Sequence, residues 1–551
     1  MKPSMKRRYL FIAAAMFSML TMQCQDPLKD IEINVSTNII HYSSMLQIED
    51  GNGNAVNNLN VELTGRDAGS IYNLAGLKEF HIEGGLLGLG VHPQADPTTD
   101  KSVEFTLILS GNDIITQLVP LTITEGQMHS VQTINVLKKS DAPLGVSVQS
   151  PTVILENNTI SGSKTVSTTN ENETSNITNV TMTDGTKFQD ESGKDVTGGE
   201  LKTVLVNLDP SKESALAVFP GGSLTANNVI AEGQTQVSAG SFIPASIANI
   251  EFTVGSTSIK KFNKPIQIAM QLDPEFVNVN TGNVLGTGEQ IGVYSYETTT
   301  GQWKFEKNVA VEKVNGKLVA NFETTHLTWY MVGNYVSACT SPVVLNLNAS
   351  WMQTGVTYPL KVDAMLAGKV IGSVQVSAST TNTSVKIANL PLSSTGVSIH
   401  ISTLDGQVLT AAGGVTLPQN GCAAAHSIAI SQPANTAPKV TLQLYVRCPG
   451  NGDVINVLPT FYLYYRETKS SSDASGFKLL GVVTNGFLSS TLLKAGTAEY
   501  DFKAVWGDKI KYANKKTLQV DNSATVGTQP GDIIGEKAGA VNLQMLTEAC
   551  K

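Results

Sequence analysis

Residues 311–322 read VEKVNGKLVANF and indicate the fold more clearly than any other part of the chain. Two short runs of alternating apolar and polar residues flank Asn315-Gly316, the pair that best suits a two-residue type I′ turn. The stretch therefore predicts a β-hairpin. A second hairpin is predicted just upstream, where Val293–Tyr296 and Trp303–Phe305 flank the polar residues 297–302.

The same pattern extends outward over the whole chain. Short alternating runs separated by Gly and Asn recur along the 551 residues, whereas long amphipathic helical patterns are nearly absent. Such a length suggests roughly three to five domains. The sequence therefore predicts an all-β fold of tandem immunoglobulin-like β-sandwich domains that follow an N-terminal lipoprotein signal peptide.

Changes in composition suggest the domain boundaries. Residues 31–140 contain strand, turn and strand patterns typical of a small seven-stranded sandwich, and residues 141–200 are polar, which indicates either a flexible linker or an exposed hairpin. The predicted organisation is a signal peptide (1–23), a lipidated tether (24–30), an immunoglobulin-like or carboxypeptidase-regulatory-like sandwich (31–140), the polar segment (141–200), a larger β domain (201–338) and two further sandwiches (339–432 and 439–551).

The N-terminus predicts export. Basic residues precede the apolar run Tyr9–Met22, which is too short to span a bilayer as a helix, and Cys24 follows it. This arrangement resembles the lipobox of bacterial lipoproteins and implies lipid on Cys24, although residues 21–23 depart from the family pattern. Residues 25–30 resemble the acidic stretch of Bacteroidetes surface lipoproteins. We expect an outer-membrane or cell-surface lipoprotein, with a periplasmic or secreted protein as the alternative.

Without Cys24 the chain has an even number of cysteines, which in an oxidising compartment predicts two disulfides rather than a metal site. Three pairings are open, and we favour Cys339 with Cys422 and Cys448 with Cys550, because each pair brackets one domain-sized segment. The net charge of −8 argues against a nucleic-acid partner. No motif predicts a metal, a cofactor or an enzyme that acts on external substrates.

Parts of residues 201–338 resemble a ZU5-type domain, namely Phe262–Ile266, the hairpin from Tyr294 to Lys304, and the sequence His-Leu-Thr-Trp-Tyr at His326–Tyr330. The last of these is also similar to the self-cleaving His-Leu-Ser/Thr site of GAIN domains. The resemblance implies a β domain for this segment. It also implies autoproteolysis that leaves two fragments joined by β-pairing.

In the chemistry that this resemblance implies, His326 is the general base toward the hydroxyl of Thr328, which attacks the carbonyl carbon of Leu327. A structural interpretation is open as well, since in a continuous strand His326 and Thr328 share one face and Leu327 points to the other. Without a distorted backbone these residue types are inert, so we favour the structural interpretation.

The C-terminal domain contains a run of large residues at 461–465, on both faces of one predicted strand. One face fits a core, and the other fits either a contact with a neighbouring domain or a sugar-stacking platform. The candidates for stacking are Tyr462, Tyr464, Trp506 and Tyr512. The leading hypothesis is a non-catalytic structural, adhesive or binding protein of the cell envelope, held to the membrane by lipid and facing an unknown protein or glycan. The alternatives are a glycan-binding accessory lipoprotein of a polysaccharide uptake system and a self-cleaving surface protein.

Overall fold

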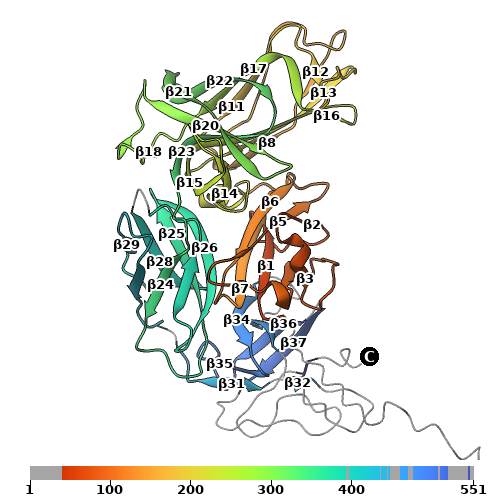
Figure 1. Ribbon diagram of the computed structural model, residues 1–551. Coiled ribbons are helices and arrows are strands. Elements are labelled where there is room, and N and C mark those ends of the chain that lie inside the picture. The colour runs from red at the N-terminus through yellow and green to blue at the C-terminus, as the bar shows by residue number, and fades with distance from the viewer. Residues whose placement is uncertain are drawn as a thin grey trace, which may run out of the picture. The chain divides into compact units, whose positions relative to one another are not determined.

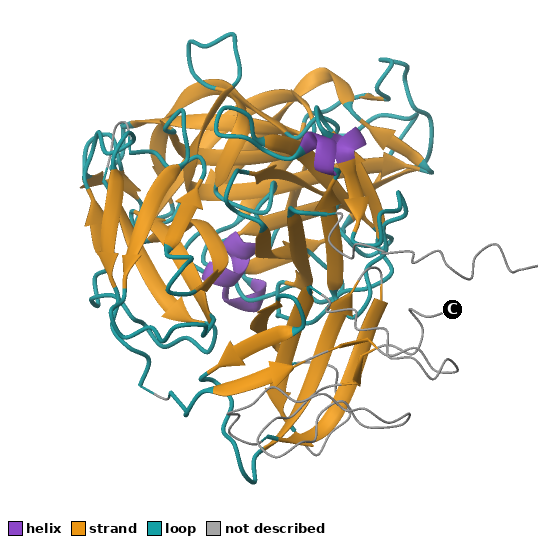
Figure 2. Ribbon diagram, turned by 60° about the horizontal axis from the view of Figure 1, so that its bottom comes forward, coloured by secondary structure: helices purple, strands orange, loops and turns teal. Residues whose placement is uncertain are grey.

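A computed structural model of the protein describes residues 40–392, 396–434, 436–443, 445–446, 460–468, 476–506, 509–518 and 544–545. These residues all fall within one of the chain's two compact units, Ile40–Lys551. The fold is all-β, as predicted, and strands dominate every view of it (Figures 1 and 2). In the part of the chain that the structure describes, α2 (Glu213–Ala217) is the only α-helix.

The first sandwich, here called the N-terminal sandwich, packs two sheets around alternating apolar residues. In β5, for example, Val103, Phe105, Leu107 and Leu109 are buried and the residues between them are partly exposed. The sheets have the orders β3-β4-β1-β7 and β2-β5-β6. The strands are β1 (Ser43–Asp50), β2 (Asn60–Thr64), β3 (Ile71–Asn73), β4 (Leu86–Val91), β5 (Val103–Ser110), β6 (Gln117–Ile123) and β7 (His129–Val136).

The large β domain follows and contains both predicted hairpins. Residues Gln290–Glu297 pair with residues Gln302–Ala310, and Val311–Val314 pair with Lys317–Ala320. Asn315 and Gly316 have φ values of 50° and 82°, which a type I′ turn requires. The strands of this domain after residue 199 are β13 (Glu200–Leu208), β14 (Thr225–Ile230), β15 (Ser238–Val254), β16 (Thr257–Ile259), β17 (Lys261–Gln271), β18 (Val277–Asn278), β19 (Asn283–Val284), β20 (Gln290–Glu297), β21 (Gln302–Val314), β22 (Lys317–His326) and β23 (Trp329–Ser337).

The polar segment 141–200 belongs to the large β domain and is not a separate linker. Its strands β8 and β9 pair with β13, whereas β10 and β11 form a hairpin that extends the sheet beside β17. Val166, Val180 and Met182 alternate with polar residues and are buried, so the polar composition reflects exposed edge strands. The strands are β8 (Val146–Gln149), β9 (Thr152–Ile154), β10 (Lys164–Ser167), β11 (Thr178–Met182) and β12 (Phe188–Gln189).

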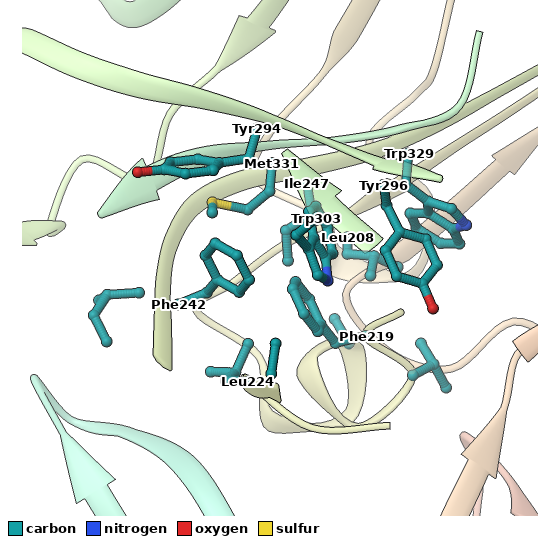
Figure 3. Close-up of a cluster of buried hydrophobic side chains, with 14 of the residues drawn as sticks. Leu208, Phe219, Leu224, Phe242, Ile247, Tyr294, Tyr296, Trp303, Trp329 and Met331 are labelled. Carbon is teal, nitrogen blue, oxygen red and sulfur yellow. The ribbon is translucent and has the colours of Figure 1, made fainter. Parts of the chain in front are cut away.

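The core of the large β domain is aromatic, and Figure 3 shows its side chains converging from several strands and from the segment around α2. Phe219 stacks on Trp303 with ring centroids 5.2 Å apart, and the ring centroid of Phe242 lies 4.9 Å from that of Trp303. Trp303 and Trp329 are both almost fully buried. Burial of rings of this size contributes most of the stabilisation of such a core, and it holds β20, β21 and β23 together.

The third unit, here called the disulfide-bonded sandwich, has the strand orders β29-β28-β25-β26 and β27-β24-β30. Its strand β26 also pairs with β7, so the first of these orders and β7-β1-β4-β3 of the N-terminal sandwich form one eight-stranded sheet. Cys339 and Cys422 form a disulfide with their Cα atoms 5.5 Å apart, which is the pairing that we favoured from the spacing. The strands are β24 (Val343–Asn348), β25 (Tyr358–Leu366), β26 (Lys369–Ala378), β27 (Ser384–Ile387), β28 (Val397–Thr403), β29 (Val415–Leu417) and β30 (Ala425–Ala429).

The last unit, here called the C-terminal sandwich, has a sheet of order β34-β33-β36-β37 and the pairs β31-β35 and β32-β38. Its core contains Phe461 and Leu463 from one face of β33. The strands are β31 (Val440–Gln443), β32 (Tyr445–Val446), β33 (Phe461–Glu467), β34 (Lys478–Val483), β35 (Phe487–Ser490), β36 (Glu499–Trp506), β37 (Lys509–Thr517) and β38 (Gln544–Met545).

Candidate functional site

The predicted self-cleavage residues lie at a corner between two strands. His326 is the last residue of β22 and Trp329 is the first of β23, so Leu327 and Thr328 form the connection. β22 pairs with β17, whereas β23 pairs with β15 and β20. The chain therefore changes its partners at this corner, and the residues do not lie in one continuous strand, as the structural interpretation had assumed.

The two side chains that would perform the cleavage form hydrogen bonds with other groups instead. The hydroxyl of Thr328 donates to the backbone oxygen of Tyr296. The ring of His326 places Nδ1 3.3 Å from Oγ1 of Thr324 and Nε2 3.8 Å from Oε1 of Glu306. A general base has to lie within hydrogen-bond reach of the hydroxyl that it deprotonates. In this arrangement His326 orients toward Thr324 and Glu306 instead.

The hydroxyl groups near the corner also bond to a carbonyl that takes no part in that reaction. Tyr330 donates from its hydroxyl to the backbone oxygen of His326 at 2.5 Å, and Thr324 Oγ1 lies 3.1 Å from the same oxygen. Burial raises the pKa of the Tyr330 hydroxyl, which keeps it protonated as a donor. Cleavage before Thr328 would need donors at the oxygen of Leu327, one residue further on. The network therefore closes the corner between β22 and β23.

The proposed sugar-stacking platform is not exposed, which corrects the prediction for its two central residues. Tyr462 is 2% exposed and Tyr464 is fully buried. The side chain of Trp506 lies outside the described residues, and Tyr512 is 48% exposed. A platform needs coplanar exposed rings, so the outer face of β33 has the other role that we considered, contact with a neighbouring domain.

That neighbour is the N-terminal sandwich. The hydroxyl of Tyr462 lies 2.8 Å from Oγ of Ser43, which in turn lies 2.8 Å from Nδ1 of His129. Around this polar contact, apolar side chains from both sandwiches form a separate buried cluster, consisting of Met45, Leu86, Val131, Tyr462, Tyr464, Leu479, Val505 and Ile510. Each fully buried side chain of this size stabilises the contact by about 1.5–3 kcal/mol.

Ionisable groups are buried at the same contact. Burial lowers the pKa of His129 to about 4 and that of Lys503 to about 8. The ammonium group of Lys503 lies 5.0 Å from the ring centroid of Tyr464 and 5.2 Å from that of Phe477. Burial also raises the pKa of Glu49 on β1. The sequence alone does not reveal these residues, because no local motif marks a lysine or histidine that two distant segments bury.

A hollow of about 690 Å³ lies between the large β domain and the two sandwiches on either side of it in the sequence. Within it, Lys369 forms a largely buried ion pair with Asp273 at 3.4 Å and donates to the backbone oxygen of Pro210 at 2.7 Å. Removal of one partner of such an ion pair is costly, so the pair ties β26 to the segment that follows β17, and the bond to Pro210 ties β26 to the loop that precedes α2. We assign this ion pair a structural role.

Metal and membrane sites are not found among the described residues. Within the residues that the structure places, no group of three or more His, Cys, Asp or Glu side chains is positioned to hold a metal ion. In the same part of the chain, no helix has the length and hydropathy required to cross a membrane. Three of the cysteines, Cys24, Cys448 and Cys550, lie outside the described residues.

Comparison with known proteins identifies no family for this chain. No family model and no curated protein matches it. Among solved structures, it is similar to a variant of BcpA, the major pilin subunit of Bacillus cereus, with 11% identity, a TM-score of 0.12, and coverage of 71% of this chain and 99% of that one. It is also similar to a streptococcal ancillary pilin, with 8% identity, a TM-score of 0.13, and coverage of 47% and 93%. TM-scores this low support no argument about function.

Proposed function

We propose that this chain is a non-catalytic protein of the bacterial cell envelope, exported and anchored by lipid on Cys24, that acts as a structural or adhesive module. One observation carries the proposal. Tyr462 and Tyr464, which we considered for sugar stacking, are buried against another part of the protein, as in the contact between Tyr462 and Ser43. The corner at Leu327–Thr328 likewise holds two strands together.

The construction of the domains favours the same role. Sandwiches that bury side chains such as Tyr462 and Tyr464 against one another suit a scaffold better than a catalyst that has to open and close. A disulfide within one sandwich adds resistance to unfolding outside the cell. The ZU5-like resemblance remains a prediction about the large β domain and adds no activity to this proposal.

The proposal is tested by expressing the full chain, signal peptide included, in a bacterium that exports and lipidates proteins, beside a Cys24→Ala variant. We expect the wild-type chain in the membrane fraction and the variant in the soluble exported fraction. Protease added to intact cells then distinguishes exposure on the surface from a periplasmic location. Wild-type protein found only in the soluble fraction would contradict the lipid anchor.

A further inference from the structure

The three sandwiches share one arrangement of their first and last strands. In the C-terminal sandwich, β31 and β32 are counted together as the first strand. In each sandwich the first strand lies parallel to the last and antiparallel to the fourth, and the second strand pairs with the fifth. The three parallel pairs are β1 with β7, β24 with β30, and β32 with β38. The third strand differs, because it pairs with the fourth strand in the N-terminal sandwich and with the second in the other two.

This arrangement determines how a pulling force would act on the N-terminal sandwich. The pairing runs along all of β1, from Ser43 opposite His129 to Asp50 opposite Val136. The chain enters the sandwich at Ser43 and leaves it beyond Val136, so tension is applied at opposite ends of the paired strands. Force in this direction slides the strands past each other, and the hydrogen bonds between them have to break together.

We infer that the chain transmits tension along its backbone and that the parallel pair β1–β7 resists that tension. This inference rests on the proposed role as an anchored structural module and adds a mechanical function to it. A force between the anchored N-terminus and the large β domain loads this pair, because β8 of the large β domain is the next strand after β7. The buried apolar residues on β1 and β7, Leu46, Ile48, Ile134 and Val136 among them, hold the strands on the core while they are loaded.

The disulfide-bonded sandwich has a covalent version of the same device. Cys339 precedes β24 and Cys422 precedes β30, so the disulfide joins the two chain segments where the parallel pair begins. Tension that enters at Cys339 passes through the disulfide into β30. While the disulfide is intact, force therefore cannot extend the chain between the two cysteines, which are 83 positions apart.

A parallel pair of terminal strands could also be only a way to fold a sandwich, and the direction of pulling separates the two explanations. The full-length oxidised protein is held by its N-terminus and by an azide-bearing residue placed at one of two exposed positions. Asp141 follows β7, so pulling there slides β7 along β1. Met128, which is 50% exposed, precedes β7, so pulling there peels the pair open from one end.

We expect the rupture force of the N-terminal sandwich to be at least about twofold higher with the handle at Asp141 than with the handle at Met128. Chemical denaturation should give the two labelled proteins similar stability, because both positions are exposed. Equal rupture forces, or a lower force at Asp141, would overturn the inference. The rupture forces do not depend on lipid. Failure of the proposed Cys24 anchor would appear in the membrane fractionation, whereas failure of the mechanical role would appear in the rupture forces.

Pulling the same protein from its two termini tests the covalent part. In a Cys448→Ser background, which takes the predicted Cys448–Cys550 bond out of the comparison, reduction of Cys339–Cys422 should add roughly 300 Å to the released length, at about 3.6 Å for each of the 83 residues. A Cys422→Ser variant should show the added length without reductant. An unchanged released length in both cases would mean that the disulfide does not shield this sandwich from force.

Discussion

Single residues decide between catalysis and structure at the corner between β22 and β23. The sequence His-Leu-Thr could be read either as a cleavage site or as part of a strand, because residue types alone do not report hydrogen-bond partners. The deciding facts are the bond from Thr328 to the backbone of Tyr296 and the bond from Tyr330 to the backbone of His326. The first of these depends on a strand 32 positions away in the sequence, which no local motif reveals.

A structural role for Thr328 predicts a loss of stability when its hydroxyl is removed. Thr328→Ala leaves the backbone oxygen of Tyr296 without its donor, which should lower the free energy of unfolding by about 1 kcal/mol. Thr328→Ser keeps the donor and should stay within a few tenths of a kcal/mol of the wild type. Denaturant titration of the three proteins measures the difference. An unchanged stability in Thr328→Ala would argue against this role.

His129 predicts a dependence of stability on pH. Burial lowers its pKa to about 4 in the folded state, from the ordinary value of 6.5, so between these values the unfolded chain binds the extra proton. Stability should therefore fall by about 2 kcal/mol as the pH drops from about 7 to about 5. In His129→Gln this part of the fall should disappear. Denaturant titrations of both proteins at the two pH values provide the measurement, and parallel curves would contradict the prediction.

At the scale of single elements, much of the fold could be predicted from the sequence. Alternation and the Asn315-Gly316 turn predicted the paired strands β21 and β22, because a hairpin is specified by neighbouring residues. The role of residues 141–200 could not be derived in this way. β10 is the edge strand of its sheet and pairs with β11. Both strands bury only one face, so their polar residues outweigh the buried Val166 and Val180.

The turn at 315–316 predicts a substitution effect that arises from the backbone alone. A Cβ on Gly316 would meet nothing within 4 Å, but the φ of this residue is +82°. Gly316→Ala should therefore lower stability by about 1 kcal/mol, because side chains disfavour that conformation. Asn315→Gly is the matched control and should stay close to the wild type. Thermal denaturation of both variants tests this, and equal midpoints would contradict it.

The second predicted disulfide, between Cys448 and Cys550, lies outside the described residues and stays a prediction. Tyr445 and Val446 lie parallel to Gln544 and Met545. Cys448 follows the first pair in the sequence and Cys550 follows the second, and parallel strands end at the same edge of a sheet. We therefore predict a Cys448–Cys550 bond. Peptide mapping without reductant should find the two cysteine peptides linked, whereas free thiols at either position would contradict the prediction.

At the scale of the whole described chain, the decisive contact joins segments at opposite ends of the sequence. Ser43 and Tyr462 are 419 positions apart and their hydroxyl groups lie 2.8 Å from each other. The run at 461–465 places large residues on both faces of β33, yet composition cannot distinguish a sugar-stacking platform from a contact with a neighbouring domain. Only the three-dimensional arrangement identifies the neighbour.

The proposal that an anchored chain performs no chemistry on itself can be checked by the intact mass of the mature protein exported by a lipidating bacterium. We predict one unbroken chain that starts at Cys24 and is heavier than residues 24–551 by the mass of its lipid. His326→Ala and Thr328→Ala variants should be equally intact. Two fragments that meet at Leu327–Thr328 in the wild type and are absent from both variants would contradict the proposal.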